Sequence, residues 1–146
     1  MTDIGDHLTQ HNVVLIRGVP GSGKTTLART AFPTHVHMET DEFFMLGGVY
    51  RFDKDLLSEA HGCTLARFKH AMRQRVPTVV SNTFTQHWEI MQYAMVMPDG
   101  TWPLVIRCAD CFENTHGVPM AKVRQMQERM EPWEGEVFVS RGKVVG

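Results

Sequence analysis

Residues 13–26 have the sequence VVLIRGVPGSGKTT, which joins an apolar run to a glycine-rich loop. The β-branched run at residues 13–16 is typical of a buried central strand. Residues 18–25 then satisfy the pattern G-x-x-x-x-G-K-[ST]. A short helix is expected from about Lys24 to Phe32, where Pro33 ends it. Because a strand, a glycine loop and a helix follow in the order that a phosphate-binding loop needs, the sequence predicts a site for a nucleoside triphosphate.

The chemistry of this loop assigns a role to each part of it. Glycines at 18, 21 and 23 allow backbone angles that let N–H groups converge on phosphate oxygens. The helix that follows adds unpaired donors and the positive end of its dipole. Lys24 is expected to reach the β- and γ-phosphates, and the Thr25 hydroxyl to bind magnesium. The residues predicted to contact the nucleotide are Pro20, Gly21, Ser22, Gly23, Lys24, Thr25 and Thr26.

The rest of the chain alternates between strand and helix patterns. Further strands are predicted at 35–41, 78–80 and 102–107, with an edge strand at 136–140, and helices at 54–75, 86–97 and 118–131. Strands that alternate with helices predict an α/β fold with a mainly parallel sheet, here of four to five strands with helices on both faces.

Length, charge and cysteine content narrow the class of protein. The 146 residues fit a single domain spanning 1–146. The net charge of −1 excludes a strongly basic protein that coats nucleic acid. No apolar run approaches the roughly 18 residues of a membrane span, so no membrane partner is expected. Three cysteines are too few for a disulfide scaffold, which predicts a cytoplasmic protein.

A phosphate-binding loop serves kinases, GTPases, motors and switches alike, so the loop alone does not name a reaction. Residues 79–82 (VVSN) stand where an aspartate for magnesium is expected, and they end in Ser81 and Asn82 instead. The chain has no N-K-x-D-type sequence for reading guanine and no room for the appended domains of a motor. A small phosphotransferase is the class that remains.

Asp41 is the candidate for the base of such a reaction. It is predicted at the carboxyl end of the second strand, beside the crevice where open α/β sheets bind ligands. Phosphoryl transfer to a hydroxyl needs a carboxylate that accepts the proton and orients the oxygen. Glu39 and Glu42 flank Asp41, and strand alternation is expected to direct both to the opposite face. A second interpretation is a helix N-cap, because Thr40-Asp41-Glu42 precedes a turn.

Several motifs follow the loop in a specific order. They are Thr40-Asp41-Glu42-Phe43-Phe44, then Asn82-Thr83 with Trp88-Glu89, and then Asn114-Thr115-His116-Gly117-Val118-Pro119. With these motifs the chain resembles the small polynucleotide-kinase-like P-loop kinases over about residues 13–131.

This resemblance implies a P-loop kinase fold with a small helical lid at about residues 112–131. It implies ATP with magnesium as the donor. The implied acceptor is a hydroxyl of a nucleic acid or nucleotide, such as a 5′-hydroxyl end or a modified base in DNA. Asp41 matches the family's catalytic acidic residue, and with Thr25 it is also expected at the magnesium. The lid's candidate catalytic residues are His116, Arg124 and Arg129.

The chain departs from the family pattern at three positions, and other interpretations stay open. Ser81 stands where the family usually has Asp, Phe84 where Asn is common, and Glu113 where a basic residue is common. These departures favour one alternative, a nucleotide-gated regulatory protein with slow hydrolysis. Within the kinase interpretation, a small-metabolite kinase stays open as a further alternative.

Three further groups of residues have competing interpretations. Aromatic residues after Asp41 either stack an acceptor base or fill the core. The basic residues at 67–75 either guide a phosphate backbone or form a solvated helix face. Cys108 and Cys111 are spaced as C-x-x-C, which indicates ordinary strand-end cysteines, a redox pair or half of a metal site. The aromatic residues are Phe43, Phe44, Tyr50 and Phe52.

Overall fold

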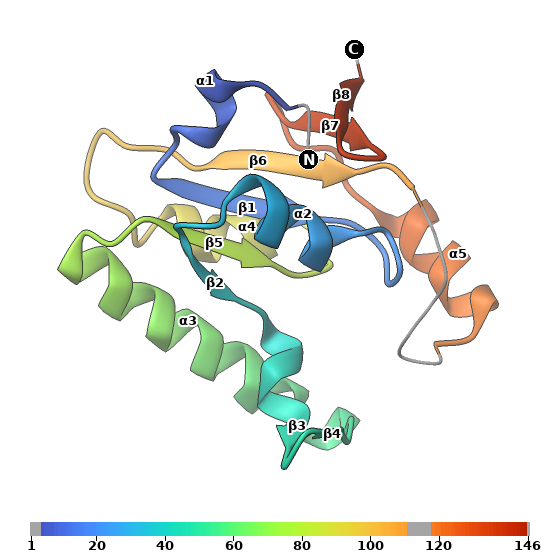
Figure 1. The fold of residues 1–146 in the computed structure, drawn as a ribbon. Coiled ribbons are helices and arrows are strands. Elements are labelled where there is room, and N and C mark those ends of the chain that lie inside the picture. The colour runs from blue at the N-terminus through green and yellow to red at the C-terminus, as the bar shows by residue number, and fades with distance from the viewer. Residues whose placement is uncertain (1–3, 111–117, 146) are drawn as a thin grey trace.

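The computed structural model describes residues 4–110 and 118–145, which build a six-stranded sheet (Figure 1). The strand order is β2-β5-β1-β6-β7-β8, in which the first five strands run parallel and β8 runs antiparallel to β7. Their bounds are β1 Val13–Arg17, β2 Val36–Met38, β5 Thr78–Ser81, β6 Leu104–Cys108, β7 Val137–Ser140 and β8 Lys143–Val145. The predicted α/β fold with a mainly parallel sheet is confirmed.

Two short hairpins go beyond what the sequence pattern predicted. Strand β8 follows β7 through Arg141 and Gly142, both at positive φ (52° and 78°), as a tight two-residue turn requires. Gly47 and Gly48 likewise join β3 (Met45–Leu46) to β4 (Val49–Tyr50) with φ of 57° and 81°. The β3–β4 hairpin forms a separate two-stranded sheet, and β8 raises the main sheet above the predicted four to five strands.

Helices cover both faces of the sheet. The α-helices are α1 Asp6–Thr9, α2 Lys24–Ala31, α3 Leu57–Gln74, α4 His87–Ala94 and α5 Met120–Arg129, with short 3₁₀ helices η1 Thr40–Phe44 and η2 Lys54–Leu56. Val14 and Ile16 of β1 pack with α1 and α2, whereas Leu15 packs with α3 and α4 on the other face. This alternation explains why a continuous apolar run is needed in β1, because both of its faces are buried.

A small third cluster joins α5 to the glycine-rich loop. Val19 of the loop packs against Val123 and Met130, and all three side chains are buried. Val118 and Met126 are partly buried against them. The helix α5 is therefore attached to the loop between β1 and α2 through its own apolar contact.

The most deeply buried charge lies at the end of β1. Arg17 has no exposed surface, and its guanidinium donates to the Phe84 carbonyl from Nε (2.9 Å) and Nη2 (2.6 Å). Its Nη1 lies 3.0 Å from Oε1 of Glu136, which is also nearly buried. Burial lowers the pKa of Arg17, although the hydrogen bond and the charge of Glu136 oppose that shift. Arg17 thus ties the strand before the loop to the segment after β5 and to the start of β7.

Phe84 occupies a strained backbone position in this arrangement. Its φ is 45°, in the left-handed region that a bulky residue rarely adopts. The Phe84 ring is buried edge-to-face against Tyr93, with 5.4 Å between ring centroids. Phe84 is therefore a core residue.

Across residues 4–110 and 118–145, no helix combines the length and the apolar character that crossing a bilayer requires.

Candidate active site

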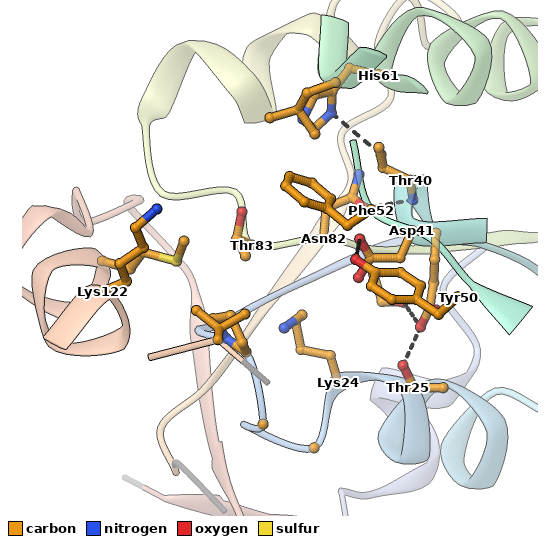
Figure 2. Close-up of a pocket in the computed structure, with 18 of the residues that line it drawn as sticks. Lys24, Thr25, Thr40, Asp41, Tyr50, Phe52, His61, Asn82, Thr83 and Lys122 are labelled. Atoms are coloured by element: carbon orange, nitrogen blue, oxygen red, sulfur yellow. Dashed lines mark hydrogen bonds between the residues drawn. The ribbon is translucent and has the colours of Figure 1, made fainter. Parts of the chain in front are cut away.

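A cavity of about 640 Å³ opens at the carboxyl ends of β1, β2 and β5 (Figure 2). This is the edge at which open parallel sheets bind ligands. Its lining residues are Pro20, Gly21, Gly23, Lys24, Thr25, Thr26, Glu39, Thr40, Asp41, Tyr50, Phe52, Leu57, His61, Ser81, Asn82, Thr83, Val118, Pro119, Lys122 and Met126. The loop, the two acidic residues after β2 and the face of α5 thus surround one space.

The glycine-rich loop forms the floor of the cavity and leads directly into α2. Gly23 caps the helix with φ 90°, a conformation that favours glycine. A Cβ at Gly18 would collide with Ser22 Oγ and lie 3.2 Å from the Cys108 carbonyl oxygen, so a side chain there would force these neighbours to shift. Six of the seven residues predicted to contact the nucleotide line the cavity. The seventh, Ser22, is buried, and its hydroxyl has no hydrogen-bond partner within the described part of the chain.

Lys24 and Thr25 begin α2 with both side chains at the cavity. Lys24 Nζ donates to the Val19 carbonyl at 3.0 Å, which holds the ammonium over the loop. The Thr25 hydroxyl donates to Oε1 of Glu39. The loop therefore presents a cation and a hydroxyl to the same space, as a phosphate site requires.

Glu39 is the site residue that the sequence analysis missed. Its Oε1 accepts a hydrogen bond from Ser81 Oγ at 2.8 Å and lies 3.2 Å from His37 Nε2. The expectation that Glu39 points to the opposite face is wrong for a simple reason. Residues two apart in a strand share a face, so the strand pattern that was expected to run to Asp41 puts Glu39 on the same side as Asp41, and both residues line the cavity. Only Glu42 points elsewhere, and it pairs with Arg67 at 3.3 Å.

The hydrogen bonds around Glu39 keep it ionised. Burial raises the pKa of its carboxyl, but the hydrogen bonds from His37, Thr25 and Ser81 outweigh this effect and lower the pKa to about 2. The side chain is 18% exposed, so the charge is partly shielded from water. A fixed negative charge therefore lies beside the first turn of α2.

The lowered pKa of Glu39 predicts a loss of stability in acid. Because its pKa is about 2 in the folded chain and 4.5 as a free side chain, the ionised form contributes about 3 kcal/mol above pH 4.5. This contribution is lost as the pH falls from about 5 toward 2. Urea unfolding between pH 6 and pH 3 should show the Glu39→Gln variant converging on the wild type. The exposed Glu42→Gln variant is the control, and a constant difference for Glu39→Gln would contradict the prediction.

Asp41 lies in the first turn of η1, exposed at the cavity. The Tyr50 hydroxyl donates to Asp41 Oδ1 at 3.4 Å. Burial, followed by the charge of Asp41, raises the pKa of Tyr50 to about 12. The N-cap interpretation is wrong, because the cap position of η1 is Glu39 and no side chain caps it. Asp41 is thus an accessible carboxylate in the same cavity as Lys24.

Two contacts fix η1 in front of the sheet. The Thr40 N–H donates to Asn82 Oδ1 at 2.9 Å, which fastens η1 to the end of β5. Thr40 Oγ1 also lies 3.3 Å from His61 Nδ1 on α3 (Figure 2). Because both neighbours belong to larger elements, the position of Asp41 is set by the sheet and by α3.

The aromatic residues after Asp41 divide between core and cavity. Phe44 is buried, and the rings of Tyr50 and Phe52 pack on it with centroid separations of 6.4 and 5.1 Å. Tyr50 and Phe52 line the cavity, and Phe52 is 52% exposed. Phe43 is not among the lining residues. Two of the four rings therefore face the space beyond Asp41.

The lid candidates are distributed differently from the prediction. Lys122 and Met126 of α5 line the cavity, and Lys122 lies across it from Asp41 and Tyr50 (Figure 2). Arg124 and Arg129 are exposed on α5 and do not line the cavity. Lys122 is four residues before Met126, so the two side chains lie on one face of α5. His116, like Glu113 and Cys111, lies outside the described residues.

Two remaining groups lie away from the cavity. The basic residues at 67–75 are exposed, and none of these lines the cavity, which favours a solvated face. Cys108 is buried at the end of β6, and burial raises the pKa of its thiol to about 11. The basic residues concerned are Arg67, Lys69, His70, Arg73 and Arg75.

Comparison with known proteins agrees with this geometry. A family model described as "AAA domain" matches residues 13–116. The chain belongs to this AAA-domain family. The matched region contains the loop, both acidic residues after β2 and the end of β5, whereas α5 and strands β7 and β8 lie beyond it. The part shared with the AAA-domain family therefore includes most of the residues that line the cavity, but not those of α5.

Relatives and solved structures place this AAA-domain chain in a P-loop kinase-like fold. NEDD4-binding protein 2 from Homo sapiens is 34% identical over 133 residues, covering 82% of this chain. The chain spans only 8% of that relative's length. A gluconokinase from Sinorhizobium meliloti 1021 superimposes with a TM-score of 0.57 at 18% identity, covering 88% of this chain and 81% of that one.

A chain of the Pnkp1/Rnl/Hen1 complex gives a TM-score of 0.51 at 17% identity. The match covers 77% of this chain and 38% of that one. At these identities the likeness concerns the fold, and the reaction has to be argued from the site.

Proposed function

We propose that this chain is an ATP-dependent kinase that transfers the γ-phosphate to a hydroxyl of a nucleic acid or nucleotide. One observation supports the proposal: Lys24, Thr25 and the accessible carboxylate of Asp41 all line the same cavity. Phosphoryl transfer needs a phosphate-binding cation and a proton-accepting carboxylate on either side of the transferred group. Both are supplied by elements that the sheet holds in place.

The donor half of the proposed reaction uses the loop. Backbone N–H groups of residues 21–26 and the N-terminal end of α2 bind the phosphates, and Lys24 moves from the Val19 carbonyl to the β- and γ-phosphates. Magnesium, when bound, neutralises charge on these phosphates. The Thr25 hydroxyl and a cavity carboxylate suit it, because magnesium prefers oxygen ligands. Two carboxylates lie at the cavity, Glu39 and Asp41, and the sequence predicts Asp41.

The acceptor half uses Asp41 as the base. Its carboxylate accepts the proton of the acceptor hydroxyl as that oxygen attacks the γ-phosphorus. The bond from the γ-phosphorus to the β–γ bridging oxygen breaks, and ADP leaves. Charge that develops on the transferred group is stabilised by Lys24 and by a lid cation. Lys122 already faces the cavity, whereas α5 has to shift before Arg124 or Arg129 reaches it.

The acceptor side of the cavity is suited to a planar substrate. Tyr50 and Phe52 offer ring faces beyond Asp41, and a stacked base contributes about 1–3 kcal/mol per ring. The polar neighbours His61 and Thr40 can donate to or accept from a sugar or base edge. A nucleoside unit with a free hydroxyl combines such a flat surface with such polar edges.

The test is transfer of labelled γ-phosphate from ATP with magnesium to a panel of acceptors. The panel holds single- and double-stranded DNA and RNA with 5′-hydroxyl ends, hydroxymethylated DNA, free nucleosides and gluconate. Label on a nucleic acid or nucleoside supports the proposal and names the substrate. Label on gluconate alone would favour a small-metabolite kinase. Release of free phosphate without a labelled acceptor would favour a nucleotide-gated regulatory protein.

Lys24→Ala is expected to abolish stabilisation by nucleotide. A ligand at 100 times its Kd stabilises a folded chain by about 2.7 kcal/mol, which is visible as a higher Tm. Because Lys24 is the loop's cation at the cavity, its removal should eliminate the rise in Tm that magnesium and ATP produce. Lys69→Ala, exposed on α3, is the matched control. A full rise in Tm with Lys24→Ala would contradict the assigned role of the loop.

A further inference from the structure

The strand β5 ends without the carboxylate that a phosphate-binding loop normally works with. In P-loop enzymes magnesium is held by the loop's Ser or Thr and by an Asp at the end of a neighbouring strand. Here Ser81 ends β5, directly beside β1, with Ile16 opposite Ser81 in the register. A serine hydroxyl carries no charge, so it cannot replace the carboxylate.

The carboxylate of Glu39, at the end of the neighbouring strand β2, lies next to Ser81. β2 pairs with β5 on the side away from β1, and Glu39 follows the last residue of β2. Glu39 Oε1 accepts hydrogen bonds from both Ser81 Oγ, at 2.8 Å, and Thr25 Oγ1. One carboxylate oxygen therefore lies within hydrogen-bond reach of the side chain at the expected acidic position and of the loop hydroxyl.

The surroundings of Glu39 hold this oxygen in place. His37 Nε2 lies 2.7 Å from Ser81 Oγ and 3.2 Å from Glu39 Oε1, so three side chains converge on it. Glu39 also lines the cavity with Lys24 and Thr25, and an ion bound with the nucleotide can reach it.

We infer that Glu39 supplies the magnesium-binding carboxylate of this site. The negative charge that P-loop enzymes usually have at the end of the strand corresponding to β5 is here at the end of β2. This inference rests on the proposed function, since the magnesium enters with ATP. Thr25 and Glu39 then both turn their oxygens from each other to the metal. Ser81 and His37 act as positioning residues that keep the Glu39 carboxylate oriented.

Moving the charge back to position 81 tests the inference. The Kd of a fluorescent ATP analogue is measured with magnesium and with EDTA, and Mn²⁺ binding in the presence of ATP is followed by EPR. For Glu39→Gln, the ratio of the Kd in EDTA to the Kd in magnesium should fall about 10-fold or more. In the double variant Glu39→Ser/Ser81→Asp, this ratio should return most of the way to the wild-type value. Glu42→Gln, a neighbouring carboxylate outside the cavity, should behave as the wild type.

The outcomes separate this inference from the proposed function. A wild type that binds no ATP analogue under either condition would remove the proposed function itself. A wild type that binds ATP with magnesium, beside a Glu39→Gln variant with undiminished metal dependence, would overturn only the role of Glu39. Thermal unfolding of each variant verifies folding. If Glu39→Gln does not fold, Glu39→Ser takes its place, and a folded Glu39→Ser with undiminished metal dependence would overturn the inference. Loss of metal dependence in a folded double variant would also overturn it.

Discussion

Replacing Asp41 with Asn lowers the rate of phosphoryl transfer by about 10²-fold or more, while affinity for ATP stays close to that of the wild type. Asn retains the size of the side chain and its hydrogen bond from Tyr50, but its amide cannot accept the proton of the acceptor. The loss should therefore fall on kcat. It is measured as the rate of labelled phosphate transfer to the best acceptor of the panel.

Glu42→Gln is the control for Asp41→Asn. Glu42 belongs to the same short helix, and its carboxylate pairs with Arg67 outside the cavity. Its rate should match that of the wild type. An unchanged rate for Asp41→Asn would remove this residue from the mechanism. A loss confined to ATP affinity would instead place Asp41 on the donor side, at the magnesium.

Arg17→Met destabilises the fold by about 3–5 kcal/mol, because it leaves Glu136 and the Phe84 carbonyl buried without their main partner. The neighbouring Arg107 is 3.7 Å from Glu136 and only partly offsets the loss. Urea unfolding gives the free energy of unfolding. Adding Glu136→Gln to Arg17→Met should restore part of it, because the second change removes the unpaired charge.

An exposed ion pair in the same chain provides the comparison for Arg17→Met. Arg67 and Glu42 lie 3.3 Å apart with side chains 50% and 44% exposed. Because water already solvates both groups, Arg67→Met should cost less than about 1 kcal/mol. If Arg17→Met lowers the free energy of unfolding by no more than Arg67→Met does, burial does not increase the contribution of the Arg17–Glu136 pair to stability.

The sequence was sufficient for the features that depend on neighbours in the chain. The strand, loop and helix at residues 13–31 are local, and each signal is independent of the rest of the fold. The parallel sheet follows from the alternation of strands with helices. Six of the seven residues expected at the nucleotide line the cavity, because the loop's backbone places them together.

Features that depend on distant partners were not predictable in the same way. The role of Arg17 was not predictable, because its partner Glu136 is 119 residues away along the chain. Glu39 was overlooked because its three hydrogen-bond partners come from β2, β5 and α2. Lys122 was overlooked because the face of α5 that meets the cavity is set by packing on Val19.

That packing has a practical consequence for anyone who exchanges parts between kinases. Val19 is a loop residue whose side chain packs against Val123 and Met130 on the lid side. A loop transplanted alone would leave those two side chains without their contact, and a lid transplanted alone would uncover Val19. The loop and α5 should therefore be exchanged together, although more than 90 residues of chain separate Thr25 from Met120.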